Sequence, residues 1–516
     1  MAAIISIDTG SSSMKATLLS MREGARQGKE LARSVQNCSM PGDDAVRVEL
    51  DAAVFADALA ACLADLVPEA ARLSLEIRAL ALTSQRSSVL AVDENGRPLR
   101  PILMWHDKRS APLCEEINRN AGTVYAVCGM KASPVFSASK MRWLKDNEPD
   151  IYRRAAKLLG IHDYLLFLLT GDFVTDASFA SRTNLLDLRG MNWSPELIRR
   201  FGLDREKLCA IRPVGSIVGH AAGEAARRAG LPPHIPVISA GGDQQCAALG
   251  LSVLRRGDVA VNTGTGAFVT AALDGPVFDP EMRVLCNVSA VPSVSDLAPG
   301  LATGRWVLEA AVLSAGLTWQ WFCGSFFDGD FHVAEAAAVA SPPGAGGVIM
   351  LPCLGGKGSP DWNPGARASF HGMSLATGRG DLARACLEGI AAELADCLAL
   401  VRSVAKLPPL AGVRCAGGLS QSPLFARIFC DSCGVSLHCF RGGEATTRGL
   451  WMSAALALGD MANLADAFAQ ATREEEIHTL TPDAALHDFY TGINRERHAL
   501  YAATVHIRSG LRVEEA

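Results

Sequence analysis

The most constraining feature of the sequence is a strand–turn–strand pattern that occurs twice. The chain opens with an apolar segment at 4–8, a turn of small residues at 10–13 and a second apolar segment at 15–19. The same order returns in segments 258–262, 263–266 and 267–272. Short apolar runs separated by a glycine-containing turn predict a β-hairpin. The repeat therefore predicts two related halves.

The length of the chain also favours two domains. A single hydrophobic core usually stops growing at about 250–300 residues, and this chain has 516 residues, 49% of them hydrophobic. Strands predicted at 77–83 and 236–240 accompany helices predicted at 52–66, within 140–169 and at 245–251. This mixture predicts an α/β fold, and we place the domain boundary near residue 252, giving domains at 1–252 and 253–516.

Charge and hydropathy exclude several classes of partner. The chain has 49 Lys plus Arg against 54 Asp plus Glu and no block rich in Lys and Arg, so nucleic acids and anionic membranes are not expected partners. No apolar run reaches the roughly 20 residues of a membrane helix. The first apolar segment is interrupted by Asp8 before it reaches the length of a signal peptide. We therefore expect a cytoplasmic protein.

The first turn has the composition of a phosphate-binding loop. Small side chains at Thr9, Gly10, Ser11 and Ser12 leave backbone N–H groups accessible to a polyphosphate. Asp8, at the end of the preceding strand, could hold Mg²⁺, usually through water, because this ion keeps much of its hydration shell. An ordinary Gly/Ser hairpin turn would look the same.

The second turn makes the phosphate-binding hypothesis more specific. Gly264 and Thr265 offer a second set of amides and a hydroxyl, which would face the first turn across a cleft between the domains. Neither turn fits the GxxxxGK[ST] pattern, and no GxGxxG follows a strand, so P-loop and dinucleotide-binding sites are disfavoured.

Asp243 is the candidate catalytic base. It follows an apolar strand and two glycines, and catalytic carboxylates of α/β folds commonly lie at strand ends. Phosphoryl transfer to an alcohol needs a carboxylate within hydrogen-bond reach of the attacking hydroxyl. The alternative is that Asp243 caps the following helix, a position that Asp favours.

Several motifs along nearly the whole chain resemble those of the FGGY family of carbohydrate kinases, within the actin-like ATPase superfamily. Segment 140–144, Lys-Met-Arg-Trp-Leu, resembles the first family signature, and segments 372–373, 381–382 and 387–388 resemble the second. Cys386 is unusual within that second signature. The resemblance implies two actin-like, ribonuclease H-like domains with a catalytic cleft between them, the sugar in the first domain and the nucleotide in the second.

The resemblance also implies roles for individual residues. It makes Asp243 the base and places Asp8 at the magnesium–ATP end, with the two turns on either side of the phosphates. Segment 416–422 resembles the adenosine loop of the family, where Gly417 and Gly418 allow a purine to approach the backbone and Gln421 could meet the base. A turn at the start of a helix is the alternative for this segment.

Two further segments correspond to family substrate loops. Gln85 and Arg86 lie in the first loop, and Trp105 and Asp107 lie in the second. Polar side chains suit a polyhydroxyl ligand, and an indole offers an apolar wall for its carbon face. A surface salt bridge between Arg86 and Asp107 is the alternative. Gln244, next to the base, is a further candidate for substrate binding.

These motifs match no familiar substrate pattern completely. Xylulokinases typically have Gln-Met-His where this chain has Gln85-Arg86-Ser87, and glycerol kinases have Gln-Arg-Glu. The arrangement of Trp105, Asp107 and Arg109 resembles that of ketopentose kinases, and this resemblance implies a ketopentose substrate.

We therefore expect ATP-dependent, Mg²⁺-dependent phosphorylation of a ketopentose such as D-xylulose. The alternatives are a glycerol or other short-polyol kinase and, from another class, an actin-like nucleotide switch or assembly protein. The family resemblance also allows a homodimer.

Overall fold

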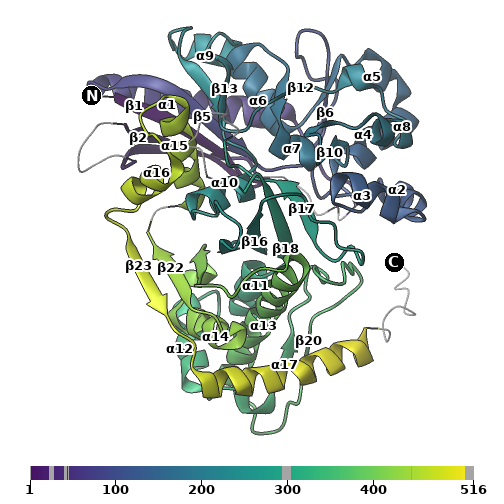
Figure 1. Cartoon of the computed structure of the whole chain (residues 1–516), viewed down its shortest axis with the longest axis vertical. Helices are drawn as coiled ribbons and strands as arrows, with labels where there is room; N and C mark the ends of the chain where they lie inside the picture. The colour runs from purple at the N-terminus through teal and green to yellow at the C-terminus, as the bar shows by residue number, and fades with distance from the viewer. Residues whose placement is uncertain are drawn as a thin grey trace.

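The computed structural model describes residues 2–21, 28–39, 44, 46–292, 304–442 and 444–505. These residues form two α/β domains, each built on one large mixed sheet, which confirms the predicted fold class. In Figure 1 the N-terminal domain lies above the C-terminal domain. None of the helices in the described ranges combines the length and the apolarity needed to cross a lipid bilayer.

The sheet of the N-terminal domain has six strands in the order β13-β14-β5-β1-β2-β3. β1 pairs with β2 in the antiparallel direction and with β5 in the parallel direction. Both hairpin strands predicted at the start of the chain are present. The strands are β1 (Ala2–Thr9), β2 (Ser13–Ser20), β3 (Glu30–Asn37), β5 (Glu76–Ser84), β13 (Ser216–His220) and β14 (Pro236–Ser239).

The sheet is apolar on both faces because helices cover both of them. On one face, Ile5 and Ile7 pack with α1 (Ala52–Arg72), α6 (Ile161–Thr170) and α9 (Glu224–Arg228). α1 extends to Arg72, beyond the predicted end at residue 66, and contains Pro68. On the other face, Ile4 belongs to a core that includes residues of α10 (Asp243–Gly250) and α15 (Ala445–Ala457).

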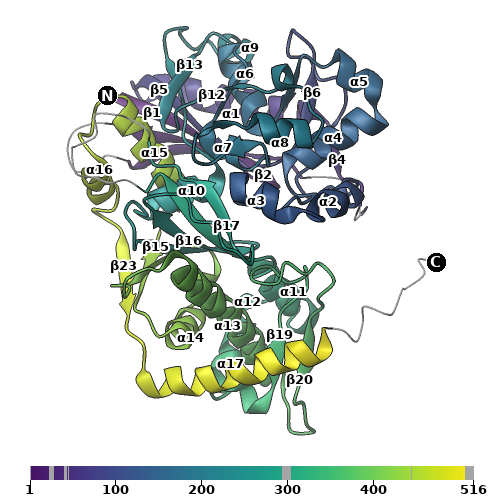
Figure 2. The ribbon, with the colours of Figure 1, turned by 45° about the vertical axis from the view of Figure 1, so that its right-hand side comes forward.

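The sheet of the C-terminal domain has seven strands in the order β17-β18-β16-β15-β21-β22-β23. Its hairpin β15–β16 confirms the predicted second occurrence of the strand–turn–strand pattern. The strands are β15 (Val259–Thr263), β16 (Ala267–Leu273), β17 (Leu285–Val288), β18 (Trp306–Val312), β21 (Val413–Ala416), β22 (Leu437–Arg441) and β23 (Glu476–Leu480). α13 (Arg379–Ala405) and α14 (Pro423–Cys433) contact this sheet, and α17 (Ala484–Thr504) lies across the base of the domain (Figure 2).

Shorter elements complete both domains. The predicted helical region at 140–169 is interrupted by a short strand, β8 (Lys157–Leu159). The remaining helices are α2 (Ala111–Asn118), α3 (Ala121–Cys128), α4 (Ser137–Asn147), α5 (Pro149–Arg154), α7 (Ala177–Ser181), α8 (Pro195–Arg200), α11 (Gly316–Phe326), α12 (Phe331–Ala340) and α16 (Leu464–Ala471). The remaining strands are β4 (Glu49–Leu50), β6 (Leu90–Val92), β7 (Ile102–Leu103), β8 (Lys157–Leu159), β9 (Val174–Asp176), β10 (Leu186–Asp187), β11 (Asn192–Trp193), β12 (Ala210–Arg212), β19 (Ile349–Leu351) and β20 (Ser369–His371).

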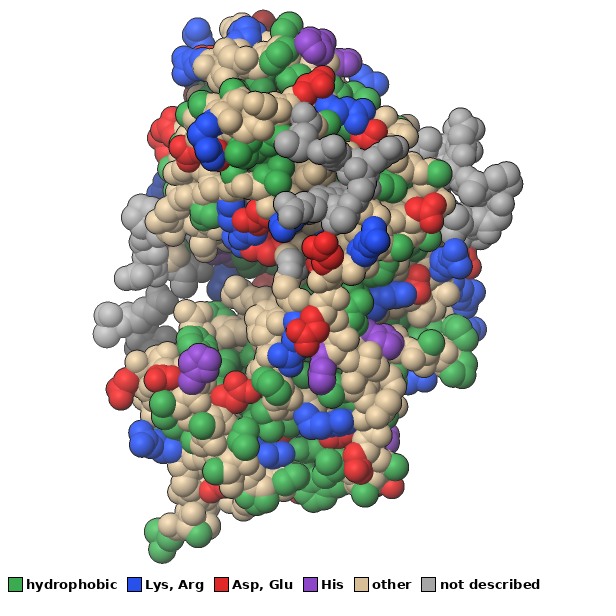
Figure 3. All heavy atoms as spheres, turned by 90° about the vertical axis from the view of Figure 1, so that its left-hand side faces the viewer, with side chains coloured by type: hydrophobic (Ala, Val, Ile, Leu, Met, Phe, Trp, Pro, Cys, Tyr) green, Lys and Arg blue, Asp and Glu red, His purple; other side chains and the backbone are tan. Residues whose placement is uncertain are grey.

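Charged side chains are mixed in sign on the face of the molecule seen in Figure 3. Lys and Arg alternate with Asp and Glu over both domains, and the two signs do not separate into large patches on this face. A nucleic-acid interface normally shows clustered Lys and Arg. This face therefore lacks the charge distribution of such an interface.

α10 and α15 lie between the two sheets and join the domains (Figure 1). Their backbones approach closely at two glycines. A Cβ atom on Gly250 would lie 1.9 Å from the carbonyl oxygen of Ala445, and one on Gly449 would lie 2.1 Å from that of Cys246. No side chain fits at such distances, so both positions require glycine.

Gly449→Ala is expected to lower the melting temperature of the protein. Alanine in a helix interior is normally about 1 kcal/mol more favourable than glycine, but here overpacking against a backbone carbonyl would cost about 1–3 kcal/mol or more. Thermal unfolding followed by circular dichroism measures the change. The control is Gly492→Ala on α17, where nothing lies within 4 Å of the added Cβ, and its melting temperature should stay the same or rise. A rise for Gly449→Ala as well would contradict the tight helix contact.

Candidate active site

The first predicted phosphate turn connects β1 to β2 and is bonded to both candidate substrate loops. The backbone N–H of Gln85 donates to the Thr9 carbonyl (2.7 Å), and its side-chain amide donates to the Gly10 carbonyl (3.1 Å). The indole Nε1–H of Trp105 donates to Ser11 Oγ (3.1 Å). The turn, Gln85 and Trp105 therefore form one cluster, with Ser12 exposed beside it.

Asp8 lies at the end of β1 among other carboxylates. Burial raises the pKa of the Asp8 carboxyl to about 7; the negative charges of Asp243 and Glu444 add to this, while the Lys15 ammonium opposes it. Lys15, opposite Asp8 on β2, also forms an ion pair with Glu444 at the start of α15 (2.8 Å). Sequence reasoning missed Lys15, although its position just after the turn was a usable signal. Because the negative charges of Asp243 and Glu444 lie near the Asp8 carboxylate, this position is suited to binding a cation.

Asp243 is the first residue of α10, and Gly242 occupies the N-cap position. Asp243 Oδ1 accepts a hydrogen bond from the backbone N–H of Gln244 (2.8 Å) and forms an ion pair with Arg86 Nε (3.0 Å). Among the residues that the structure describes, no hydrogen bond to its Oδ2 occurs. Gln244 Oε1 accepts a hydrogen bond from Asn262 Nδ2 (3.1 Å), at the end of β15. The Asp243 carboxylate thus has one engaged oxygen and one without a hydrogen bond. Its neighbour Gln244 links this region to the second turn through Asn262.

A buried polar network holds the backbone just before Asp243. The Gly242 N–H donates to Ser178 Oγ (2.9 Å), which in turn donates to Asp176 Oδ1 (2.7 Å). The Ser239 hydroxyl donates to the other oxygen of Asp176 and lies 3.0 Å from His162 Nε2. All four side chains are fully buried, so this network positions the turn that carries Asp243.

A second buried cluster lies behind Arg86. Glu309, fully buried on β18, binds Arg182 Nη1 (3.1 Å) through Oε1 and Arg86 Nη1 (3.5 Å) through Oε2. Gln245 Oε1 accepts a hydrogen bond from Arg86 Nη1 (3.0 Å). Burial, followed by the nearby charge of Arg86, lowers the pKa of Arg182 to about 10, and Glu309 opposes this shift. Sequence reasoning missed Arg182 and Glu309, although one charged residue inside the apolar strand β18 was a signal.

Asp107 lies in a separate ion-pair network. Its carboxylate binds Arg109 Nη2 (2.8 Å) and accepts a hydrogen bond from the Val48 N–H (2.8 Å), and the residue is 2% exposed. Arg109 also binds Glu49 (2.6 Å). Arg86 pairs with Asp243 and Glu309 instead. The structure therefore separates Asp107 from Arg86, and the substrate-binding role of Asp107 stays a prediction.

The second predicted phosphate turn is attached to the start of α11. The carbonyl oxygens of Gly264 and Thr265 accept hydrogen bonds from the N–H groups of Gly316 (3.1 Å) and Leu317 (3.0 Å). A Cβ atom on Gly316 would lie 2.3 Å from the Gly264 oxygen, so this contact requires glycine. Gly264 and Thr265 are both exposed. Sequence reasoning missed Gly316, because its partner is distant along the chain.

The predicted adenosine loop packs against the end of β15, next to the second turn. Gly417 has a φ of 96°, and a Cβ atom there would lie 2.5 Å from the Thr263 carbonyl oxygen. Gly418 has nothing within 4 Å of its Cβ position. Gln421 is exposed and donates through its amide to the Phe440 carbonyl (3.0 Å). Open space therefore lies beside Gly418, whereas Gly417 is packed against Thr263, and the adenosine-binding role of the loop stays a prediction.

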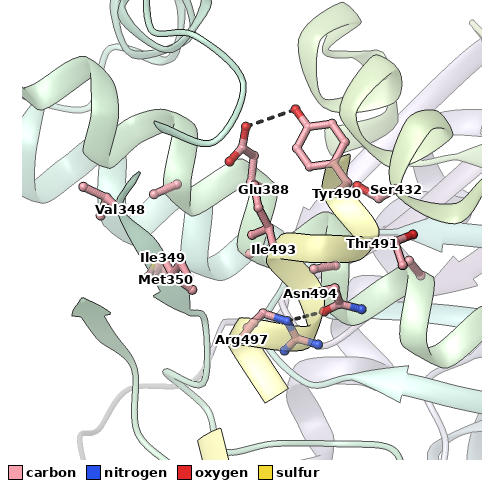
Figure 4. Close-up of a pocket in the computed structure, with 14 residues that line it drawn as sticks. Val348, Ile349, Met350, Glu388, Ser432, Tyr490, Thr491, Ile493, Asn494 and Arg497 are labelled. Carbon is pink, nitrogen blue, oxygen red and sulfur yellow. Dashed lines mark hydrogen bonds between the residues drawn. The ribbon is translucent and has the colours of Figure 1, made fainter. Parts of the chain in front are cut away.

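The residues that carry the two family signatures belong to the scaffold. Lys140 is buried, and its ammonium donates to the carbonyls of Pro134 (2.6 Å) and Val135 (2.7 Å). Glu388 Oε1 accepts hydrogen bonds from Arg384 Nε (2.8 Å) and Tyr490 OH (3.0 Å). Glu388 and Tyr490 line a cavity of about 80 Å³. Figure 4 shows the two side chains facing each other there. The hydrogen bond between Tyr490 on α17 and Glu388 on α13 thus attaches α17 to the rest of the C-terminal domain.

Known proteins with similar sequences are sugar and polyol kinases. A glycerol kinase of Citrifermentans bemidjiense is 31% identical over 466 residues, which cover 88% of this chain and 90% of that protein. A gluconokinase of Bacillus subtilis is 27% identical over 366 residues, covering 68% of this chain and 69% of that protein. The crystal structure of ligand-bound xylulose kinase from Lactobacillus acidophilus superposes with a TM-score of 0.87 at 22% identity and covers 98% of this chain and 99% of that one.

Family models agree with these similarities and cover most of the chain. The N-terminal domain of the FGGY family of carbohydrate kinases matches residues 3–250, and the C-terminal domain of that family matches residues 259–458. The resemblance seen in the sequence motifs is confirmed, and a phosphotransferase is favoured over a nucleotide switch. The chain belongs to the FGGY family of carbohydrate kinases.

Proposed function

We propose that this enzyme transfers the γ-phosphoryl group of ATP to a hydroxyl of a short-chain polyol or sugar, with Asp243 as the general base. The observation that carries the proposal is the asymmetric environment of the Asp243 carboxylate. One oxygen is held by Arg86 and a backbone N–H, and the other is open. A base must present a free lone pair to the attacking hydroxyl while its own orientation is held.

Other residues would bind the two substrates. Arg86 lies beside Asp243 and can donate a hydrogen bond to a substrate oxygen, and Trp105 supplies an apolar wall. The backbone N–H groups of the two turns, with Thr9–Ser12 on one side and Gly264 and Thr265 on the other, would hold the phosphates. Gly417, Gly418 and Gln421 would lie along the adenosine. Closure of the domains would exclude water, which otherwise competes with the hydroxyl for the phosphoryl group.

Magnesium fits the chemistry of Asp8. Its carboxyl has a raised pKa because it is buried near Asp243 and Glu444, so a cation would relieve unfavourable charge. Within the described ranges no group of three or more His, Cys, Asp or Glu side chains could hold a metal ion, which is compatible with Mg²⁺ held by one or two carboxylates, waters and phosphates. When bound, Mg²⁺ neutralises charge on the β- and γ-phosphates.

The substrate we favour is a short polyol, with a ketopentose such as D-xylulose as the second candidate. Gln85 and Arg86 match two of the three residues of the Gln-Arg-Glu loop of glycerol kinases, with Ser87 in place of the Glu, and the relative with 31% identity is named a glycerol kinase. The ketopentose alternative rested on Trp105, Asp107 and Arg109, and both carboxylate oxygens of Asp107 are engaged by Arg109. It keeps support from the similar xylulose kinase structure. We place the reaction in the cytoplasm, and the homodimer that the family resemblance allows stays a prediction.

The test of the proposed function is release of ADP from magnesium–ATP with glycerol, erythritol, longer polyols, D-xylulose and gluconate. Wild-type enzyme should turn over at least one of these compounds. Asp243→Asn should lower kcat by about 10²–10⁴-fold, the usual contribution of a general base, because the amide cannot accept the proton. Asp488→Asn, a change at an exposed carboxylate on α17, should retain wild-type kcat. Undiminished turnover by Asp243→Asn would exclude Asp243 as the base.

Asp8→Asn should stabilise the ligand-free protein more at pH 8 than at pH 5. The pKa of Asp8 is raised from 3.8 to about 7 in the folded state. As pH rises from about 4 to 7, the unfolded chain therefore loses this proton first, and the folded state loses stability until both forms are ionised. Asparagine has no carboxyl proton to lose, so the variant does not undergo this loss of stability between pH 4 and pH 7.

Thermal unfolding at both pH values measures the difference, with Asp488→Asn as the matched control. The same change in melting temperature at pH 5 and pH 8 would contradict the raised pKa. Adding magnesium–ATP to the wild type at pH 8 should reduce the advantage of the variant, because the bound cation relieves the same charge.

A further inference from the structure

Trp105 connects two loops to which we assign different ligands. It lies in the proposed substrate loop shortly after β7, and its indole Nε1–H donates to Ser11 Oγ (3.1 Å) in the first proposed phosphate turn. The two residues are 94 positions apart in the sequence. A side chain proposed to face the sugar or polyol therefore contacts a side chain proposed to face the nucleotide.

The backbone on both sides of Trp105 is held without Ser11. The Met104 N–H donates to the Val48 carbonyl (3.0 Å), and the Asp107 N–H donates to the Met104 carbonyl (3.0 Å). The Asp107 carboxylate in turn accepts a hydrogen bond from the Val48 N–H (2.8 Å). The loop that carries the indole is thus anchored independently of the turn that the indole contacts.

The hydrogen of the Ser11 hydroxyl is poorly used. Ser11 Oγ accepts the hydrogen bond from Trp105, and its own hydrogen is directed at Gln85 Oε1 over 3.5 Å. O–H···O hydrogen bonds normally span 2.5–3.0 Å. Within the described part of the chain, the backbone N–H groups of Ser11 and Ser12 take part in no hydrogen bond either. The turn therefore has three donors available for another acceptor.

We propose that Trp105 is a positioning residue for the nucleotide: its indole N–H holds Ser11 Oγ so that the Ser11 hydroxyl donates its hydrogen to a phosphate oxygen of ATP. The inference rests on the proposed function, in which the first turn binds the phosphates. It adds a requirement to that function, because a residue assigned to the sugar or polyol also contributes to the affinity for the nucleotide.

The chemistry of the two side chains fits this arrangement. An indole N–H is a donor only, so it occupies a lone pair of Ser11 Oγ and leaves the hydroxyl hydrogen to find an acceptor. A hydrogen bond to a charged phosphate oxygen is stronger than one to a neutral amide oxygen. The hydrogen can therefore leave the long contact with Gln85 while the bond from Trp105 stays, and hydrogen bonds in a chain strengthen one another.

The backbone of the turn does not depend on the contact between Ser11 and Gln85 Oε1. The Gln85 N–H donates to the Thr9 carbonyl (2.7 Å), and the Gln85 side-chain amide donates to the Gly10 carbonyl (3.1 Å). Neither bond involves the Ser11 hydroxyl. The hydroxyl can thus exchange its acceptor while Gln85 keeps the turn in place.

The test is a double-mutant cycle between Trp105→Phe and Ser11→Ala. It is read as the Kd of a non-hydrolysable ATP analogue with Mg²⁺, measured by calorimetry. Phenylalanine keeps an aromatic wall and lacks the N–H, so Trp105→Phe should raise this Kd about three- to tenfold, the usual effect of one hydrogen bond. Ser11→Ala should raise it about tenfold or more, because the lost partner is charged.

The coupling between the two residues and the KM values separate this role from others. In the Ser11→Ala background, Trp105→Phe should change the Kd less than about twofold, because the indole N–H then has no hydroxyl to hold. In assays on the substrate that the wild type accepts, Trp105→Phe should raise the KM for ATP and change the KM for the sugar or polyol less than about twofold.

The matched control is Trp193→Phe. Trp193 lies on β11 in the same domain, is buried, and donates through Nε1–H to the Cys209 carbonyl (2.8 Å). This variant loses an indole hydrogen bond of the same kind outside the proposed site. It should lower the melting temperature and leave the Kd of the analogue unchanged.

Two results for Trp105→Phe would overturn the inference while leaving the proposed function intact. The first is an unchanged Kd, including the case in which only the KM for the sugar or polyol rises, since the indole N–H would then serve that substrate. The second is an equal fold-change of the Kd in the wild-type and Ser11→Ala backgrounds. A wild type that binds no analogue would overturn the proposed function and the inference together.

A crystal structure of the wild type with the analogue decides the question even if Trp105→Phe does not fold. Ser11 Oγ should lie within hydrogen-bond distance of both a phosphate oxygen and Trp105 Nε1. A bound analogue whose phosphates do not contact Ser11 Oγ, or a Ser11 that has left Trp105, would overturn the inference.

Discussion

The contact between α10 and α15 is the constraint on which the rest of the structure depends. These helices touch both sheets, and at Gly250 and Gly449 their backbones approach too closely for any side chain. α10 begins at Asp243, and Glu444 is the N-cap residue of α15. Because both helices start at the site, the glycine contact that joins the domains also determines where these carboxylates lie relative to each other.

Paired charge is the second organising element of the site. Asp8 and Glu444 are close to the ammonium of Lys15, and Arg86 lies between Asp243 and Glu309. Arg86 and Glu309 are buried, and buried charges are tolerated only when they compensate one another. A substitution of one of them therefore changes the electrostatics of its neighbours, which makes the site sensitive to residues that touch no substrate.

Local patterns were sufficient to predict the two hairpins, the α/β class and the position of Asp243 after an apolar strand. The charge of Glu309 inside an apolar strand was a signal in the sequence, but its partner Arg182, 127 residues away along the chain, could not be predicted. Arg109 was close enough in sequence to Asp107 to suggest a pair, but the choice between Arg86 and Arg109 depends on tertiary placement. Prediction from sequence thus succeeded for backbone turns and failed for charge partners, which are set by packing between elements.

The same distinction explains why family membership leaves the substrate open. The matching signature residues Lys140 and Glu388 hold loops and helices through hydrogen bonds to the scaffold. They report a common architecture that gluconokinases, glycerol kinases and xylulose kinases share with this chain. In the proposed site, substrate choice falls to side chains such as Arg86, which contacts Glu309, and Trp105, which contacts Ser11. Under that proposal, a change of substrate requires altered contacts around Arg86 and Trp105, while the proposed phosphate turns and the helices between the sheets can stay as they are.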